Sequence, residues 1–280
     1  MHPHLFPTIT LSLMIVTITL IHCPTSLRAD NEKYLTCEAP FNCGNFLKIN
    51  YPFWTSGRPN YCGHPSFQLN CSSDVPQINI TTKSTMNYRV LEINDSSQTL
   101  KVARTDYYTI CPAAFVNTTI DNNLFSYITS SDTNLTLYYD CRTPVATIPN
   151  LDFYQFNCSI NNTDFINYYT LSSETFLAIS NTIGACNYWV NIPILQSAVP
   201  TTATYDAVIA AIDSGFMLGW DASNSECDTC LKAGGLCGSD PTMSSFACHC
   251  SNGTFPSGCS TVTRSKHLFL LLLILISFLV

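Results

Sequence analysis

The cysteines constrain the fold of this chain more than any other feature of its sequence. Of its 15 cysteines, 14 lie between positions 37 and 259, and only Cys23 falls in an apolar N-terminal stretch. An even set of this size is typical of an extracellular chain, because thiols are oxidised to disulfides along the secretory route. The sequence therefore predicts seven disulfides. The cysteines expected to form them are Cys37, Cys43, Cys62, Cys71, Cys111, Cys141, Cys158, Cys186, Cys227, Cys230, Cys237, Cys248, Cys250 and Cys259.

Eight Asn-X-Ser/Thr sequons indicate the same compartment. A single sequon arises easily by chance in a chain rich in these residues, whereas eight beside an even cysteine set indicate a glycoprotein. The candidate glycosylation sites are Asn70, Asn79, Asn94, Asn117, Asn134, Asn157, Asn161 and Asn252.

Both ends of the sequence are apolar. Residues 11–21 are mostly apolar and are followed by a small residue, Ala29, which predicts a secretory signal peptide over 1–29. As a helix, the apolar run 268–280 would span about 20 Å, less than the roughly 30 Å hydrocarbon core of a bilayer. A polar spacer precedes this run, so residues 260–280 fit the signal for a glycosylphosphatidylinositol anchor attached at Ser260. The alternatives are a short membrane helix and a truncated sequence.

Charge and histidine content argue against two classes of function. Residues 30–260 contain 9 basic and 19 acidic side chains, a net charge of −10, which would repel a nucleic acid. Only His64 and His249 lie between the two terminal segments, and neither belongs to a motif that pairs a nucleophile with a base. We therefore expect no nucleic-acid binding, no enzymatic activity and no cofactor.

The CDTC sequence at 227–230 has the spacing of either a metal site or a pair of structural disulfides. In a secreted chain, disulfides are the usual use of such spacings. We expect disulfides there and no metal.

Hydrophobic patterning predicts a mostly β, disulfide-rich secreted ectodomain of two modules. Short alternating or β-branched runs are separated by clusters of Gly, Pro, Asn, Asp and Ser. The best boundary is the Pro-containing segment 142–150, which separates modules at 37–141 and 150–259. Six of the cysteines precede this boundary and eight follow it, so we expect each module to form its disulfides internally.

The second module contains one short amphipathic helix. The apolar residues Tyr205, Val208 and Ile212 recur at helical spacing, which predicts one buried face. Thr202 is a candidate N-cap, and Gly215 can adopt the left-handed conformation that ends a helix.

Residues 88–104 predict a β-hairpin. Placing Ile93 opposite Leu100 and Leu91 opposite Val102 gathers four apolar side chains on one face.

The same register places Arg89 opposite Arg104. Two like charges in opposed positions are destabilising unless a counter-charge lies between them, so this pair is a candidate site for a carboxylate ligand. The alternatives are neutralisation by Asp106 and side chains that diverge into solvent.

A second candidate site is the aromatic segment INYPFWTSGRPNYCG at 49–63. Its Trp54 could stack on a sugar ring while Arg58 binds a carboxylate, or the aromatic residues could belong to the core.

Two patterns resemble a known family. The sequence CEAPFNCGNFLKINYPFW…YCGHPSFQLNC resembles the galacturonan-binding module of plant wall-associated receptor kinases, and GFMLGWDASNSECDTCLKAGGLCGSDPTMSSFACHCSNG resembles the cysteine-rich C-terminal module that accompanies it. The resemblance implies an ectodomain at the extracellular face of the plasma membrane or in the cell wall. The kinase that usually follows is not recognisable in this sequence, because its glycine-rich loop, lysine, HRD and DFG motifs are missing.

The resemblance leads to two hypotheses. In the first, the chain binds pectic polysaccharide, with Ca²⁺ as a bridge between two acidic partners. In the second, it is a protein-interaction module, a co-receptor or decoy that pairs with related receptor-like kinases and does not bind pectin itself.

Overall fold

The computed structural model describes residues 26–81, 86–141, 154–160, 163–170, 186–200 and 204–259. The chain divides into two compact units, which we call the larger unit (Phe41–Asn224) and the smaller unit (Met1–Pro40 with Ser225–Val280). Four predicted features lie outside the described residues: most of the signal peptide, the boundary at 142–150, the sequon at Asn161 and the tail from Ser260. Among the described residues, no helix is long and apolar enough to cross a membrane.

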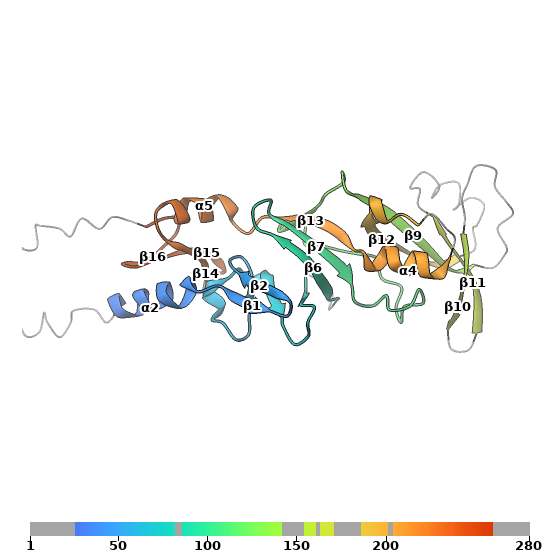
Figure 1. Cartoon of the computed structure of the whole chain (residues 1–280), viewed down its shortest axis with the longest axis horizontal. Coiled ribbons are helices and arrows are strands. Elements are labelled where there is room, and N and C mark those ends of the chain that lie inside the picture. Colours follow the sequence, from blue (N-terminus) through green and yellow to red (C-terminus); the bar gives the residue numbers. More distant parts are fainter. Residues whose placement is uncertain are drawn as a thin grey trace, which may run out of the picture. The chain divides into compact units, whose positions relative to one another are not determined.

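The larger unit is built mainly from antiparallel sheets (Figure 1). Its largest sheet has the order β3-β4-β5-β6-β7-β13-β8, in which only the β3–β4 pair is parallel. The strands of this sheet are β3 (Trp54–Thr55), β4 (Gln68–Asn70), β5 (Gln77–Ile78), β6 (Tyr88–Asn94), β7 (Thr99–Arg104), β8 (Phe125–Tyr127) and β13 (Phe216–Trp220).

A second sheet of the larger unit has the order β10-β11-β9-β12, and a small sheet pairs β1 with β2. Their strands are β1 (Phe41–Cys43), β2 (Phe46–Ile49), β9 (Asp132–Cys141), β10 (Tyr154–Ile160), β11 (Thr163–Thr170) and β12 (Cys186–Leu195). Short 3-10 helices span Asn60–Cys62, Pro65–Phe67 and Gln196–Ala198.

The smaller unit combines two helices with a three-stranded sheet of order β14-β15-β16. Its elements are α2 (Ser26–Glu38), α5 (Asn224–Lys232), β14 (Leu236–Asp240), β15 (Ser245–Cys250) and β16 (Gly253–Phe255). The mostly β, disulfide-rich fold class is thus confirmed, although α2 and α5 add to the one helix that the sequence predicted.

Strand β13 is late in the sequence but lies in the sheet built by the first half of the chain (Figure 1). On one side it pairs with β7, where Phe216 is opposite Val102 and Leu218 is opposite Leu100. On the other side it pairs with β8, where Leu218 is opposite Tyr127 and Trp220 is opposite Phe125. The side chains of Phe216, Leu218 and Trp220 are buried in the core of this sheet. Residues from both predicted modules therefore form one sheet and one core.

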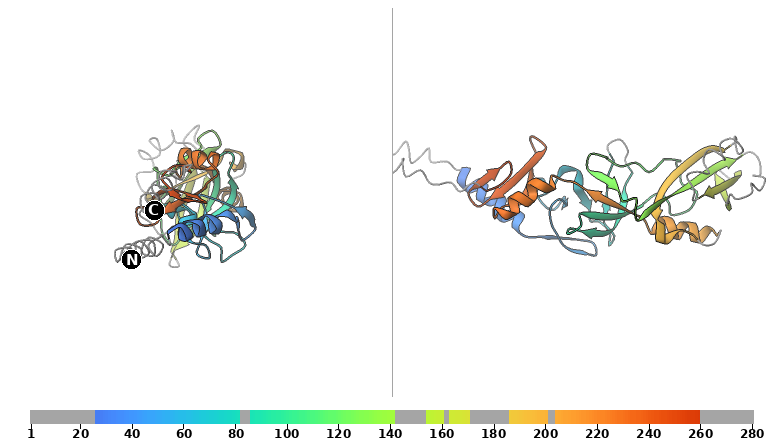
Figure 2. Two further views of the ribbon diagram at one scale, coloured as in Figure 1. Left: turned by 90° about the vertical axis from the view of Figure 1, so that its left-hand side faces the viewer. Right: turned by 90° about the horizontal axis from the view of Figure 1, so that it is seen from above.

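Helix α4 (Tyr205–Asp213) is the predicted amphipathic helix, and it packs beside β12 (Figure 2). Val208 and Ile212 are buried in a second core with the inner face of the four-stranded sheet. The N-cap is Thr204, whose hydroxyl accepts a hydrogen bond from the amide of Ala207 at 3.3 Å. The prediction of Thr202 as the cap was therefore wrong by two residues.

Gly215 links α4 to β13 in the left-handed conformation that the sequence predicted, with φ of +73°. A Cβ atom at this position would lie 2.2 Å from the carbonyl oxygen of Val102 in β7. The close approach of two backbones thus requires glycine at the entry to β13.

The hairpin of β6 and β7 forms, but its register changes along its length. Ile93 lies opposite Leu100, as predicted, whereas Val90 and not Leu91 lies opposite Val102. A β-bulge at Leu91 adds one residue to β6 and causes this shift.

The bulge also separates the two arginines that were predicted to face each other. Arg89 lies opposite Ala103, and Arg104 lies opposite Tyr88. Neighbouring positions on a strand point to opposite faces of a sheet, so the two guanidinium groups project from opposite faces. The prediction of an Arg89–Arg104 pair was wrong.

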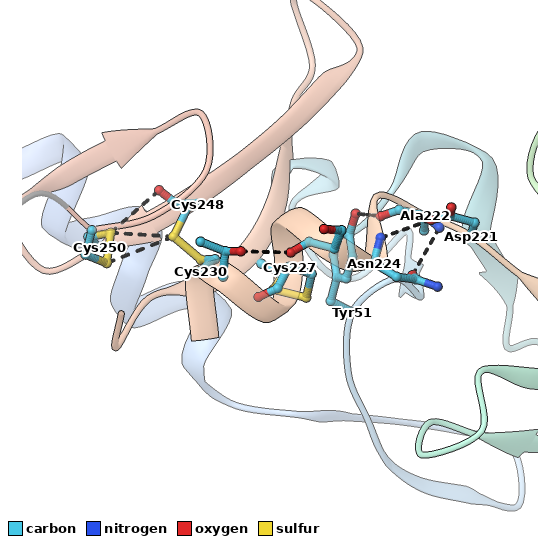
Figure 3. Close-up of a disulfide and its surroundings, with 12 residues drawn as sticks. Tyr51, Asp221, Ala222, Asn224, Cys227, Cys230, Cys248 and Cys250 are labelled. Atoms are coloured by element: carbon cyan, nitrogen blue, oxygen red, sulfur yellow. Dashed lines mark hydrogen bonds between the residues drawn. A yellow bond between two sulfur atoms is a disulfide. The ribbon is translucent and has the colours of Figure 1, made fainter. Parts of the chain in front are cut away.

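All 14 predicted cysteines are disulfide-bonded, which confirms the predicted number of bridges. Two of the bridges, Cys111–Cys158 and Cys141–Cys186, connect residues on either side of 142–150. The expected partition into six and eight cysteines was therefore wrong. The other pairs described are Cys43–Cys71, Cys227–Cys237, Cys230–Cys248 and Cys250–Cys259, and the last three lie in the smaller unit (Figure 3).

Candidate functional site

Arg104, one of the two predicted carboxylate ligands, is only 1% exposed. Its Nε and Nη2 donate to the two carboxylate oxygens of Asp106, at 2.9 and 2.6 Å, and its Nη1 donates to the carbonyl of Val116 at 2.7 Å. The guanidinium carbon also lies 4.7 Å from the ring centroid of Tyr107. Neutralisation by Asp106, the alternative stated from the sequence, is correct for this residue, which a polysaccharide carboxylate could not reach.

Arg89 has an acidic partner as well. Its Nη2 lies 2.7 Å from the carboxylate of Asp213 in α4, and the two side chains are 27% and 47% exposed. The structure therefore does not bring Arg89 and Arg104 together as an anion site, and each of them is paired with an acid of the larger unit.

Trp54 and Arg58 make separate contacts. The indole Nε1 of Trp54 donates to the carbonyl of His64 at 2.9 Å, and its ring lies against Gly63, where a Cβ atom would come within 2.6 Å of it. Arg58 lies over the ring of Phe41, 5.6 Å from its centroid, and burial lowers the pKa of its guanidinium. Both side chains are half-buried. They therefore fit the edge of a core better than an open platform on which a sugar ring could stack.

A polar groove of about 490 Å³ lies close to Trp54, on the large sheet. Side-chain amides and hydroxyls dominate its lining, and among the residues that the structure describes none of the lining residues is charged. Those residues are Ser56, Pro65, Ser66, Gln68, Leu69, Asn70, Gln77, Asn79, Thr81 and Asn87, and we call this site the polar groove.

Two adjacent strands supply the centre of the polar groove. β4 consists of Gln68, Leu69 and Asn70, and β5 consists of Gln77 and Ile78 and is followed by Asn79. Leu69 lies opposite Ile78, and Asn70 lies opposite Gln77. Leu69 and Ile78 are buried in the core at 1% and 2% exposure. Because strand residues alternate between faces, the flanking Gln and Asn side chains share the outer face. A repeated Gln-apolar-Asn pattern was therefore visible in the sequence, but sequence reasoning did not use it.

A second, smaller groove of about 210 Å³ contains a carboxylate, that of Asp132. This carboxylate accepts the backbone N–H of Met217 at 3.0 Å, and burial raises its pKa above the usual value. Its charge and its structural hydrogen bond make this groove a poorer site for an acidic polysaccharide than the polar groove.

Three cysteine sulfurs, those of Cys248, Cys250 and Cys259, lie within 4.8 Å of one another. Each belongs to a disulfide, so none offers the thiolate that a metal would need (Figure 3). The cluster is a junction of two bridges.

The neighbourhood of the polar groove should respond to pH through His64. Its neutral Nδ1 accepts the amide hydrogen of Ser66, a lining residue, at 3.3 Å, and burial lowers the pKa of His64 more than Asp121 raises it. Below the unfolded pKa of about 6.5, the unfolded chain binds the proton more readily, so the free energy of unfolding should fall as the pH drops through this value.

Urea denaturation of the wild type and of His64→Asn at pH 7.5 and pH 5.0 measures this effect. Asparagine can still accept the Ser66 amide, and other acids titrate equally in both proteins. The variant should therefore lose less stability on acidification than the wild type, and equal losses would contradict the assignment.

Two family models match this chain. The wall-associated receptor kinase galacturonan-binding model matches residues 37–104, and the wall-associated receptor kinase C-terminal model matches residues 157–253. Every residue that lines the polar groove falls within the first match.

Curated relatives from Arabidopsis thaliana carry the name leaf rust 10 disease-resistance locus receptor-like protein kinase-like. Number 2.1 is 31% identical over 88% of this chain and 38% of its own length, and number 2.5 is 32% identical over 82% and 36%. Number 2.8 is 31% identical over 83% of this chain and 26% of its own length. The chain thus spans between 26% and 38% of the length of these relatives. No solved structure matches it significantly.

Proposed function

This chain has the extracellular modules of the wall-associated and leaf-rust-resistance receptor-like kinases, and from that premise we propose that it is a receptor-like protein that binds pectic polysaccharide in the polar groove. The observation that supports this most is the position of the groove inside the galacturonan-binding match. Amides and hydroxyls can both donate and accept hydrogen bonds, which suits the hydroxyl-rich surface of a sugar.

These modules imply an extracellular or plasma-membrane location. We propose the outer face of the plasma membrane or the adjoining wall, with attachment through residues 260–280. The seven described sequon asparagines agree with this compartment, because each has an exposed or half-exposed side chain.

The lining of the polar groove predicts which form of pectin binds best. None of the described lining residues is a cation that could pair with galacturonate, and none is a carboxylate that could hold a bridging Ca²⁺. The groove therefore suits a neutral, methyl-esterified chain. We expect tighter binding to methyl-esterified than to de-esterified homogalacturonan, with little effect of salt or of a Ca²⁺ chelator.

Substitution of the two glutamines tests this site. Gln68 and Gln77 lie on the outer face of the sheet, so Gln68→Ala with Gln77→Ala should leave the core intact. If each amide makes one hydrogen bond worth about 0.5–1.5 kcal/mol, the double variant should bind methyl-esterified homogalacturonan roughly 5- to 150-fold more weakly. Isothermal titration calorimetry at two salt concentrations, with and without chelator, gives the affinities.

Gln155→Ala is the matched control, because Gln155 is also an exposed strand glutamine but lies on β10 of the other sheet. It should bind as the wild type does. Tighter binding to the de-esterified polymer, weakened by salt, would indicate an anion site instead. If no form of pectin binds, the protein-interaction hypothesis gains the support that this one loses.

A further inference from the structure

The polar groove is lined by two residues that are themselves candidate points of sugar attachment. Asn70 begins the sequon Asn-Cys-Ser, and Asn79 begins the sequon Asn-Ile-Thr. Both side chains are exposed, and both belong to the groove lining. Of the other described sequons, those at Asn94, Asn117, Asn157 and Asn252 lie outside both grooves.

The two asparagines are held in the same way. The Oδ1 of Asn70 accepts the amide hydrogen of Ser72 at 3.1 Å, and the Oδ1 of Asn79 accepts those of the Thr81 amide and hydroxyl, both at 2.9 Å. In each case the side-chain oxygen is bound to the turn that follows the strand. An N-linked glycan is attached to the amide nitrogen, which is the other arm of the same planar group, whereas these hydrogen bonds are accepted by the side-chain oxygen.

The chemistry of the groove suits such a glycan as well as it suits pectin. The first sugars of an N-linked glycan are neutral and present hydroxyls and acetamido groups, which match the amides and hydroxyls of Gln68, Gln77 and Ser66. A glycan attached at the rim is also present at a high effective concentration, of the order of millimolar for a short flexible tether. Weak contacts are therefore enough to keep it in the groove.

We infer that N-linked glycans on Asn70 and Asn79 occupy the polar groove and control the access of wall polysaccharide to it. Occupied sequons close the groove, and unoccupied or trimmed sequons open it. This inference rests on the proposed function for its effect on pectin, but the seating of the glycans can be measured without pectin.

The first measurement is protection from an endoglycosidase. The secreted glycoprotein is treated while folded and again after denaturation, and glycopeptides are quantified by mass spectrometry. We expect the glycans on Asn70 and Asn79 to be released at least about fivefold more slowly from the folded protein than the glycan on Asn252, and equally fast after denaturation. Equal release from the folded protein, or absence of glycan from both asparagines, would overturn the inference.

The second measurement uses Ser72→Ala with Thr81→Val, which removes both sequons but keeps both asparagines and the backbone amides that they bind. It also replaces the Thr81 hydroxyl, a member of the groove lining, so any tightening of binding occurs in spite of this loss. This variant should bind methyl-esterified homogalacturonan about 2- to 10-fold more tightly than the fully glycosylated protein, because no tethered competitor is present. Asn252→Gln, which removes a glycan from the smaller unit, should not change the affinity.

The outcomes separate the two proposals. If the Asn70 and Asn79 glycans are protected but no variant binds pectin, pectin binding is contradicted. The inference that the two glycans occupy the polar groove then still holds. If pectin binds equally well with and without the two sequons, the glycans do not control access to the groove. The proposed pectin-binding function then still holds.

Discussion

Replacing Phe216 by alanine is expected to lower the free energy of unfolding of the larger unit by about 3–5 kcal/mol, the usual cost of removing a buried aromatic ring. Phe216 is 1% exposed and packs edge-on against Tyr88, with ring centroids 6.1 Å apart. It belongs to β13, which lies between β7 and β8 in the seven-stranded sheet, so its loss leaves a cavity between strands from distant parts of the sequence.

Chemical denaturation of the full chain measures this change, and Met217→Ala is the control. Met217 is the next residue of the same strand, points to the opposite face and is only half-buried, so its truncation should cost much less. A loss below about 1 kcal/mol for Phe216→Ala would show that β13 does not belong to the folding core.

Arg104→Met is expected to cost about 3–5 kcal/mol, the second of the two large effects. The substitution removes a buried cation and leaves Asp106, whose side chain is 34% exposed, without its ion-pair partner. The carbonyl of Val116 loses its donor at the same time. Adding Asp106→Asn should recover part of the loss, because an unpaired amide costs less to bury than an unpaired carboxylate.

Arg89→Ala provides the comparison for this prediction. Its ion pair with Asp213 is at the surface, so the change should cost no more than about 1 kcal/mol. Urea denaturation of the wild type, Arg104→Met, Asp106→Asn and the double variant gives the coupling between Arg104 and Asp106. Equal losses for Arg104→Met and Arg89→Ala would contradict the buried role of Arg104.

Local sequence patterns predicted the local structure well. The period-two runs gave most strands of the large sheet, the helical spacing gave α4, and the left-handed position of Gly215 was recognised. These features depend on residues that are close in sequence, so propensity and alternation are sufficient to find them.

The pairing of strands and cysteines that are distant in the sequence could not be predicted from local patterns. The hairpin register was correct at Ile93 and wrong beyond Leu91, because a bulge of one residue leaves no mark in the hydrophobic pattern. The place of β13 between β7 and β8 depends on contacts between residues roughly 90 to 120 positions apart in the sequence. The even cysteine counts on either side of 142–150 suggested a partition that two bridges cross.

The candidate site shows the same limit. Because of their charge, Arg89 and Arg104 were predicted to bind a carboxylate ligand, yet in the fold each arginine forms an ion pair with an acidic residue of the protein. The polar groove arises from uncharged residues of β4 and β5 that become a site only when the two strands pair. Gln-apolar-Asn occurring twice within 12 residues was the one signal in the sequence that could have indicated it.

The insertion of β13 changes where this protein could be cut and recombined with its relatives. Exchanging residues 37–141 for those of another receptor would separate β7 and β8 from the strand that joins them, and would break the bridges Cys111–Cys158 and Cys141–Cys186. A seam after Asn224 follows the limit of a compact unit instead. The other seam has to precede Cys37, because Cys37 and Cys62 are disulfide-bonded and belong to none of the six pairs named above. A chimera that transfers ligand preference should therefore move residues 37–224 as one block, although the family models would suggest two.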